Sequence, residues 1–269
     1  MDWSNELEEA IAAAELAGQF VMDEYENFVP IPDAPASIST HVDRGAQEII
    51  LKYLRAEYSE DSLLAEEVTP TVGEAPKDRS RVWIVDPIDG TRGFAMKNGE
   101  FSVMIALVLD HRPVVGVVLE PVIGRLTYAS LNGGCFTRTG GSEPIRCKVS
   151  DCETPETSAI VLSHRKPGKP LKGVVSAIRA GRIVETYSAG IKLGMVARGE
   201  VELYVNEYAG FHDWDIAPGH ILVEEAGGKV TELDGQPVRY ALPMKPNRQG
   251  MLASNGKIHA EVMKRLIRG

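Results

Sequence analysis

A strand followed by an acidic turn is the segment of this chain with the clearest chemistry. The run from Val82 to Val85 is apolar and rich in β-branched residues, with the length of a buried strand. Pro87 fixes its own φ angle and disfavours helix at Asp86, so the strand is predicted to end there and the chain to turn. The carboxylates of Asp86 and Asp89 are three residues apart around this turn. They can converge on one point, which suits a hard divalent cation such as Mg²⁺.

Two residues after the acidic turn add a second feature. The backbone N–H groups of Gly90 and Thr91 are free to face an anion, as at a helix N-terminus. Asp, Pro and Gly are also common turn formers, so a lone Asp-Pro pair would indicate no more than a bend. Strand, paired acids and amides together predict metal-assisted phosphate chemistry.

Four further acidic positions bear on this prediction. Glu66 and Glu67 follow a short predicted strand, Asp43 lies near a helix start, and Asp215 stands at the entry to a long helix. Each has an ordinary explanation alone, because Asp at a helix start caps the helix and paired Glu residues usually face solvent. Their joint presence is better explained by a family resemblance.

The chain resembles the inositol monophosphatase-like superfamily of Mg²⁺-dependent, Li⁺-sensitive phosphatases. Asp-Pro-Ile-Asp-Gly-Thr at 86–91 is similar to the first signature of that superfamily. The segment 214–228, which begins Trp-Asp and ends Glu-Ala-Gly-Gly, is similar to the second. Leu-Leu-Ala-Glu-Glu at 63–67 is similar to the strand that carries a metal-binding glutamate. These motifs occur in the right order and spacing, and the match covers nearly the whole chain.

The resemblance implies a role for each residue of the site. Two or three Mg²⁺ ions would be held by four carboxylates and one backbone carbonyl: Glu66, Asp86, Asp89, Asp215 and the carbonyl of Ile88. Thr91, partnered by Asp43, would orient the attacking water, and the Gly90 and Thr91 amides would hold the phosphate. Glu67 is expected to support the site or to face solvent. Water would attack phosphorus directly, so no side chain would need to become phosphorylated.

Three segments resemble the 3'(2'),5'-bisphosphate nucleotidase branch of the superfamily. They are 92–108, with Asn-Gly-Glu-Phe after the first signature, 163–166, with Ser-His-Arg, and 188–192, similar to Gly-Ser-x-x-Lys. Lys192 is the candidate for the second phosphate of such a substrate. The substrate-binding residues implied by these segments, in addition to the phosphate-binding amides, are Ser163, His164, Arg165 and Lys192.

A bisphosphate substrate also needs local positive charge. A basic cluster in this otherwise acidic chain comprises His164, Arg165, Lys166, Lys169 and Lys172. The alternative interpretation of the cluster is a solvated basic loop. Asn206 stands where nucleotide-specific members often carry a basic residue, and 35–40 departs from the usual segment before the dyad aspartate. Tyr208 stands where inositol-specific members carry a substrate-binding glutamate, although Glu207 is adjacent.

These observations predict a phosphomonoesterase. The predicted substrate is 3'-phosphoadenosine 5'-phosphate, released as AMP and phosphate. The alternative within this class is an inositol monophosphatase or a fructose-1,6-bisphosphatase-like sugar phosphatase. A catalytically idle metal- or ligand-binding protein on the same fold is the alternative outside it. That alternative is disfavoured, because a pure binder needs no water-activating pair beside its metal ligands.

Composition limits the remaining possibilities. The chain has 269 residues and a formal net charge of −9, which argues against binding to a nucleic acid polymer. An acidic N-terminal segment in place of a basic one argues against a signal peptide, and no apolar run reaches the ~20 residues of a membrane span. The three cysteines, Cys135, Cys147 and Cys152, are expected to be reduced thiols, so a cytoplasmic enzyme is expected. The partner implied is a small phosphorylated substrate, and the resemblance suggests a homodimer.

The predicted elements are mixed helices and hairpin-linked strands, which favour an α+β fold. Helices are predicted at 5–27, from about 43, at 171–179, 191–198, 214–226 and 257–268. Strands are predicted at 63–64, 82–85, 101–109, 114–119, 126–129, 159–162, 183–187 and 201–205, and loops at 29–40 and 69–80. The resemblance implies a layered α/β/α/β/α sandwich. Its halves are expected to be a 1–150 domain with the first metal motif and a 151–269 domain with the second motif and the substrate segments.

Overall fold

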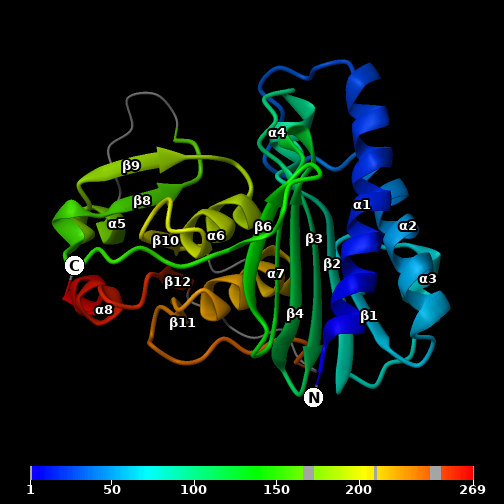
Figure 1. Cartoon of the computed structure of the whole chain (residues 1–269). Helices are drawn as coiled ribbons and strands as arrows, with labels where there is room; N and C mark the ends of the chain where they lie inside the picture. Colours follow the sequence, from blue (N-terminus) through cyan, green and yellow to red (C-terminus); the bar gives the residue numbers. More distant parts are fainter. Residues whose placement is uncertain (1, 166–172, 209–210, 243–249, 269) are drawn as a thin grey trace.

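Two β-sheets form the framework of the molecule (Figure 1). This computed structural model describes residues 2–165, 173–208, 211–242 and 250–268. The first sheet has seven strands in sequence order: β1 Ser62–Ala65, β2 Arg81–Asp89, β3 Ser102–Leu109, β4 Arg112–Glu120, β5 Arg125–Ser130, β6 Gly134–Thr139 and β7 Ile145–Arg146. The second has five strands, in the order β11 Lys229–Glu232, β12 Met251–Ser254, β10 Leu203–Asn206, β8 Ala159–Leu162 and β9 Arg182–Glu185.

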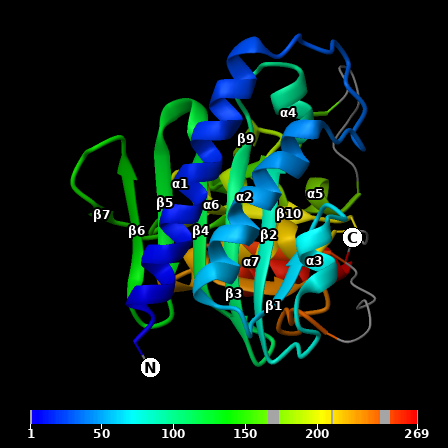
Figure 2. The same ribbon diagram turned by 90° about the vertical axis from the view of Figure 1, so that its right-hand side faces the viewer.

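Helices cover both sheets and separate them. They are α1 Ser4–Asn27, α2 His41–Glu57, α3 Pro70–Glu74, α4 Thr91–Ala95, α5 Gly173–Ile178, α6 Ala189–Ala197, α7 Asp213–Glu225 and α8 His259–Arg268, with short 3₁₀ turns at Pro121–Ile123 and Pro155–Thr157. α1 and α2 lie across one face of the first sheet (Figure 2), α6 and α7 lie between the sheets, and α5 and α8 lie beyond the second sheet (Figure 1). The layers therefore run α/β/α/β/α, which confirms the predicted fold class.

Burial on both faces explains why the central strands are almost entirely apolar. β3 and β4 are covered by α1 on one side and by α7 on the other, and nearly every residue of both strands is buried. Strands buried on both faces read as continuous apolar runs rather than as alternating patterns. The connections in the first sheet are mostly hairpins, and β1 and β2 are its one parallel pair.

The two sheets lie in separate parts of the sequence but share a core. The first sheet falls within residues 62–146 and the second within 159–254. One apolar cluster contains side chains of the first sheet, of α6 and α7, and of the second sheet. α7 belongs to the second half of the chain and packs on β4 of the first. The division into domains at residue 150 stays a prediction.

Several predicted boundaries differ from the structure. β2 does not end at Asp86 but continues through Pro87 to Asp89, and its pairing with β3 is irregular between Asp86 and Asp89. Pro87 is tolerated there because a residue at such an irregularity need not donate a ladder hydrogen bond. The segment 69–80, predicted as a loop, contains α3. Of the helix predicted at 171–179, the structure describes α5 from Gly173 onward.

The sequence pattern also misses four strands, namely β6, β7, β11 and β12. β7 has two residues, and β6 and β11 carry polar side chains at alternate or end positions, so no apolar run marks them. They are strands because neighbouring strands supply hydrogen-bond partners. In the described ranges, no helix is both long and apolar enough to cross a membrane.

Close packing of α7 on the first sheet depends on Gly116 in β4. A Cβ atom at Gly116 would lie 2.3 Å from the carbonyl oxygen of Pro218 and 2.4 Å from Cγ2 of Ile221, both in α7. We therefore expect Gly116→Ala to lower the free energy of unfolding by about 1–3 kcal/mol, the usual cost of overpacking. Urea denaturation measures this change. Gly73→Ala in α3, where a Cβ atom would meet nothing within 4 Å, is the control, and equal losses in both variants would contradict the packing argument.

Candidate metal centre and active site

Three carboxylates from two distant segments meet at the end of β2. Asp86 and Asp89 come from the last residues of that strand, and Asp215 comes from the first turn of α7. One carboxylate oxygen of each lies within 4.8 Å of the others. Asp86 and Asp89 are buried, and Asp215 is half-buried. The irregular end of β2 between the two acids is held by the Ile88 N–H, which donates to Asp86 Oδ1 at 3.2 Å.

A second acidic group adjoins the first. It consists of Asp43, Glu66 and Glu67, whose carboxylate oxygens also lie within 4.8 Å of one another. β1 pairs in parallel with β2 and ends at Ala65, so Glu66 emerges beside Asp86. Gln47 in α2 fixes the position after the strand, because its side-chain amide exchanges two 2.8 Å hydrogen bonds with the backbone of Glu67. The acids predicted as ligands therefore lie in one neighbourhood.

Electrostatic repulsion in this neighbourhood is strong. The pKa of Asp86 is raised well above its usual value, first by burial and then by the charges of Glu66 and Asp89. Burial also raises the pKa of Asp215 to about 7. Glu66 is exposed as a residue, but its carboxylate faces the other acids, and desolvation followed by repulsion from Asp43 raises its pKa to about 8. Crowded oxygen donors that are costly to ionise together form a donor set that fits hard divalent cations.

A threonine–aspartate pair lies directly beside the acids. Thr91 Oγ1 is 2.9 Å from Asp43 Oδ1 and 2.9 Å from the carbonyl oxygen of Ile88. The other Asp43 oxygen accepts from the backbone N–H and the hydroxyl of Thr40, which caps α2. Burial raises the pKa of Asp43, and these hydrogen bonds oppose the shift. The sequence prediction that Asp43 and Thr91 pair is consistent with this geometry.

The chain reverses at Gly90, between the acids and α4. Gly90 has φ of +89°, and a Cβ atom there would lie 2.7 Å from the carbonyl oxygen of Glu100. Only a glycine fits both the left-handed conformation and this approach. Thr91 is the first residue of α4, and the first N–H groups of a helix have no acceptor within it. The predicted phosphate-binding amides thus lie next to the acidic groups.

The predicted substrate residues lie together but are engaged with protein groups. Lys192 is 1% exposed, and its Nζ donates to Ser163 Oγ at 3.1 Å and to the Tyr187 carbonyl at 2.8 Å. Burial lowers the pKa of Lys192 to about 8, against the opposing charges of nearby acids that include Asp89. The lysine is therefore buried close to the acidic cluster.

Two other predicted substrate residues have acidic partners. His164 Nε2 lies 2.6 Å from Glu100 Oε2, and Arg165 forms an ion pair with Glu185. These acids reduce the local positive charge that the sequence pattern predicts. Lys166, Lys169 and Lys172, which complete the predicted basic cluster, lie outside the described residues.

Residues that sequence reasoning did not single out complete this wall of the site. The guanidinium of Arg92 lies 5.2 Å from the ring centroid of Tyr187, and the His164 ring lies 4.4 Å from the same ring. The Nε atom of Arg92 is buried without a hydrogen-bond partner. Arg92 directly follows Thr91, and this position beside the first signature was the one sequence feature that could have indicated a role for Arg92 in the site. Nothing in the sequence places Tyr187 against it.

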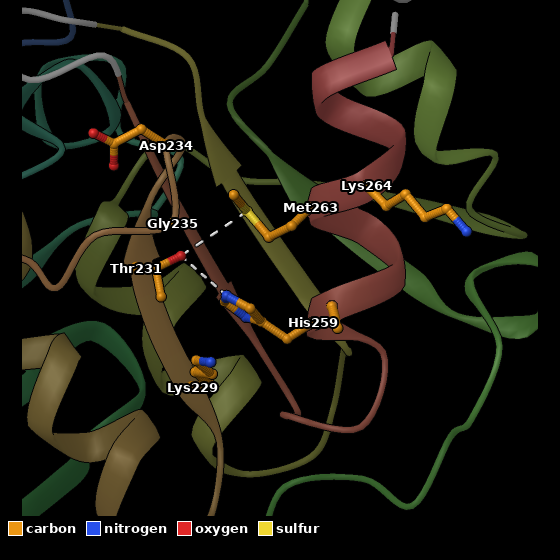
Figure 3. Close-up of a pocket in the computed structure, with 8 residues that line it drawn as sticks. Lys229, Thr231, Asp234, Gly235, His259, Met263 and Lys264 are labelled. Carbon is orange, nitrogen blue, oxygen red and sulfur yellow. Dashed lines mark hydrogen bonds between the residues drawn. The ribbon is translucent and has the colours of Figure 1, made fainter.

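A cavity on another part of the molecule contains none of the acidic residues described above. It has a volume of about 470 Å³ and lies between β11 and α8 (Figure 3). His259 is bonded there to Thr231 Oγ1 at 3.0 Å and to Ser254 Oγ at 2.8 Å. Burial, then the charge of Lys229, lowers the pKa of His259 to about 4, so the ring is neutral near pH 7. None of the residues lining this cavity belongs to the acidic groups.

Comparisons of the sequence with known proteins identify phosphatases as its relatives. The sequence model of the inositol monophosphatase family matches residues 2–268. The 3'(2'),5'-bisphosphate nucleotidase CysQ of Buchnera aphidicola is 30% identical over 243 residues, or 89% of each chain. The histidinol-phosphatase of Mycobacterium tuberculosis is 31% identical over 234 residues, which cover 86% of this chain and 85% of the relative.

Solved structures share the whole fold. An IMPase from Thermotoga maritima has a TM-score of 0.79 at 28% identity, covering 98% of this chain and 97% of the other. The extragenic suppressor protein suhB from Bartonella henselae has a TM-score of 0.81 at 26% identity, covering 98% and 99%. The chain belongs to the inositol monophosphatase family. It is a phosphoric monoester hydrolase of this metal-dependent family, so the predicted family and enzyme class are confirmed.

The raised pKa values predict a proton-coupled affinity for divalent cations. Carboxyl groups with pKa values of about 8 for Glu66 and about 7 for Asp215 are largely or partly protonated near pH 7. A cation must displace these protons, so its apparent affinity is expected to rise with pH from 6 to 8.5, by up to about tenfold per pH unit below pH 7 for each proton displaced. Calorimetric Mg²⁺ titrations in buffers of different ionisation enthalpy measure both affinity and proton release. An affinity unchanged over this range would contradict the electrostatic account.

Proposed function

We propose that this protein is a Mg²⁺-dependent phosphomonoesterase that converts 3'-phosphoadenosine 5'-phosphate into AMP and phosphate. The observation that carries the phosphatase chemistry is the convergence of the two acidic groups beside the Thr91–Asp43 pair. The nucleotide substrate is supported by the relatives named CysQ and by the buried Lys192 close to the acids.

The acidic groups supply the ligands in this proposal. Two or three Mg²⁺ ions would be held by five groups: the carboxylates of Glu66, Asp86, Asp89 and Asp215 and the carbonyl of Ile88. When bound, such ions supply Lewis acidity toward the phosphoryl oxygens and lower the pKa of a coordinated water. Glu67 would support Glu66 through its backbone contacts with Gln47.

Thr91 and Asp43 would prepare the nucleophile. The Thr91 hydroxyl has one proton, which it donates in a hydrogen bond to Asp43 Oδ1 or to the Ile88 carbonyl oxygen, each 2.9 Å away. Because that proton is used in this hydrogen bond, the Thr91 oxygen can accept a hydrogen bond from the attacking water. This contact would orient the lone pair of the water toward phosphorus. The amides of Gly90 and Thr91 would hold the phosphate oxygens at the start of α4. Water would then attack phosphorus in line with the departing ribose oxygen.

Ser163, His164, Arg165 and Lys192 would hold the rest of the substrate. Lys192 is the proposed contact for the second phosphate, because its charge lies near Asp89 and Asp215, which would hold the cations that face the first phosphate. One observation favours a monophosphate instead. Glu100 and Glu185 already partner His164 and Arg165, which leaves less free positive charge for a bisphosphate. An inositol-phosphate, sugar-phosphate or histidinol-phosphate phosphatase is therefore the second candidate.

The substrate proposal is tested by comparing kcat/KM on a panel of esters. Phosphate release is measured with 3'-phosphoadenosine 5'-phosphate, inositol 1-phosphate, histidinol phosphate and fructose 1,6-bisphosphate, with Mg²⁺ alone and with Li⁺ added. We expect the nucleotide to be preferred and Li⁺ to inhibit. A preference for another ester would refute the nucleotide assignment, and no turnover of any ester would refute the enzymatic proposal.

Lys192 provides a matched test of the second phosphate. We expect Lys192→Met, which keeps the length of the side chain but removes its charge, to lower kcat/KM for 3'-phosphoadenosine 5'-phosphate by about 10- to 100-fold, the value of a charge-assisted hydrogen bond. Adenosine 3'-phosphate lacks the 5'-phosphate, so its kcat/KM should change much less. Equal decreases in kcat/KM for the two nucleotides would show that Lys192 does not bind the 5'-phosphate.

A further inference from the structure

The carboxylate of Asp89 is held from one side by donors of two other elements. The hydroxyl of Ser188 donates to Asp89 Oδ2, and the Gly190 N–H donates to the same oxygen at 2.7 Å. Ser102 Oγ in β3 lies 3.3 Å from that oxygen and 3.0 Å from Ser188 Oγ. Within the described ranges, no donor is directed at the other oxygen, Oδ1.

The Ser188 hydroxyl is fully engaged in this arrangement. Ser188 is the N-cap of α6, and its Oγ accepts from the Ile191 N–H at 2.9 Å. Its one proton points to Asp89, so Ser188 has none left for Ser102, and the single Ser102 proton is directed at Asp89 Oδ2 or at Ser188 Oγ. Both serines are 0% exposed, and the hydroxyl orientations are therefore set by the protein rather than by bulk water.

We propose that Ser188 is a positioning residue of the metal centre. By occupying Oδ2 of Asp89, it fixes the rotamer of this carboxylate and leaves Oδ1 as the single atom that faces the cation. Because Ser188 is the N-cap of α6, the position of that helix is coupled to cation binding, and Lys192 lies in the first turn of the same helix. The inference rests on the proposed function, in which Asp89 is a cation ligand.

Mg²⁺ binding without substrate tests this role. Calorimetric titration of the wild-type protein and of Ser188→Ala is expected to show an affinity about 10- to 100-fold weaker in the variant, the usual effect of removing a partner of a ligand. Ser188→Gly separates positioning from helix capping, because glycine is an adequate N-cap but has no hydroxyl. It should bind Mg²⁺ as weakly as the alanine variant.

Controls make the outcome decisive. Ser158→Ala removes another fully buried serine, whose hydroxyl donates to the Pro155 carbonyl at 2.7 Å, and should leave Mg²⁺ affinity unchanged. Ser102→Ala keeps the N-cap of α6 and is expected to weaken Mg²⁺ binding by a smaller factor than the Ser188 variants. If circular dichroism shows that the Ser188 variants do not fold, Ser102→Ala still tests the positioning role. With Ser188→Gly, turnover should recover toward the wild-type kcat as Mg²⁺ is raised.

Failures of the two proposals are distinguishable. A wild-type protein that binds no Mg²⁺ would refute the proposed function. A wild-type protein that binds Mg²⁺, with unchanged affinity in Ser188→Gly and Ser102→Ala, would refute the positioning role alone. A kcat that stays low in Ser188→Gly at saturating Mg²⁺ would likewise show that Ser188 does not act through the cation.

Discussion

Mutual repulsion among desolvated carboxylates is the main electrostatic cost of assembling this site. Asp86, Asp89, Asp215 and Glu66 cannot all be ionised cheaply at close range, and the raised pKa values of Asp86, Asp215 and Glu66 express that cost. The fold brings these acids together because other interactions offset the cost. Divalent cations would attract all of these carboxylates, so their binding would stabilise the folded protein.

The layers explain how acids from distant segments meet. β1 and β2 run in parallel and deliver Glu66 and the acidic turn to the same end of the first sheet. α7 delivers Asp215 to that end, and its close approach to β4 is possible because residue 116 is a glycine. The second half of the chain therefore completes a site that the first half begins. Both halves contribute to one apolar core, which makes their relative position a matter of packing rather than of the acids alone.

Much of this could be predicted from the sequence, for identifiable reasons. Long apolar runs marked the central strands, and the two acidic motifs marked the ends of β2 and the start of α7. The short strands β6, β7 and β11 could not be predicted, because they depend on neighbouring strands rather than on their own pattern. β12 was also missed, although its four residues are buried and begin with the short apolar run Met-Leu-Ala. The extension of β2 through Pro87 depends on an irregular pairing with β3 that local rules do not reveal. Side-chain partnerships across the layers, such as Ser188 with Asp89 or Glu100 with His164, had no sequence signal.

Anomalous diffraction from crystals grown with Mn²⁺ in place of Mg²⁺ would show whether carboxylates from both halves of the chain share divalent cations. We expect at least two anomalous peaks among the carboxylates of Asp86, Asp89, Asp215 and Glu66, with Asp215 in contact with one of them. Crystals soaked in saturating Mn²⁺ that show no peak between Asp215 and the acidic turn would contradict this expectation.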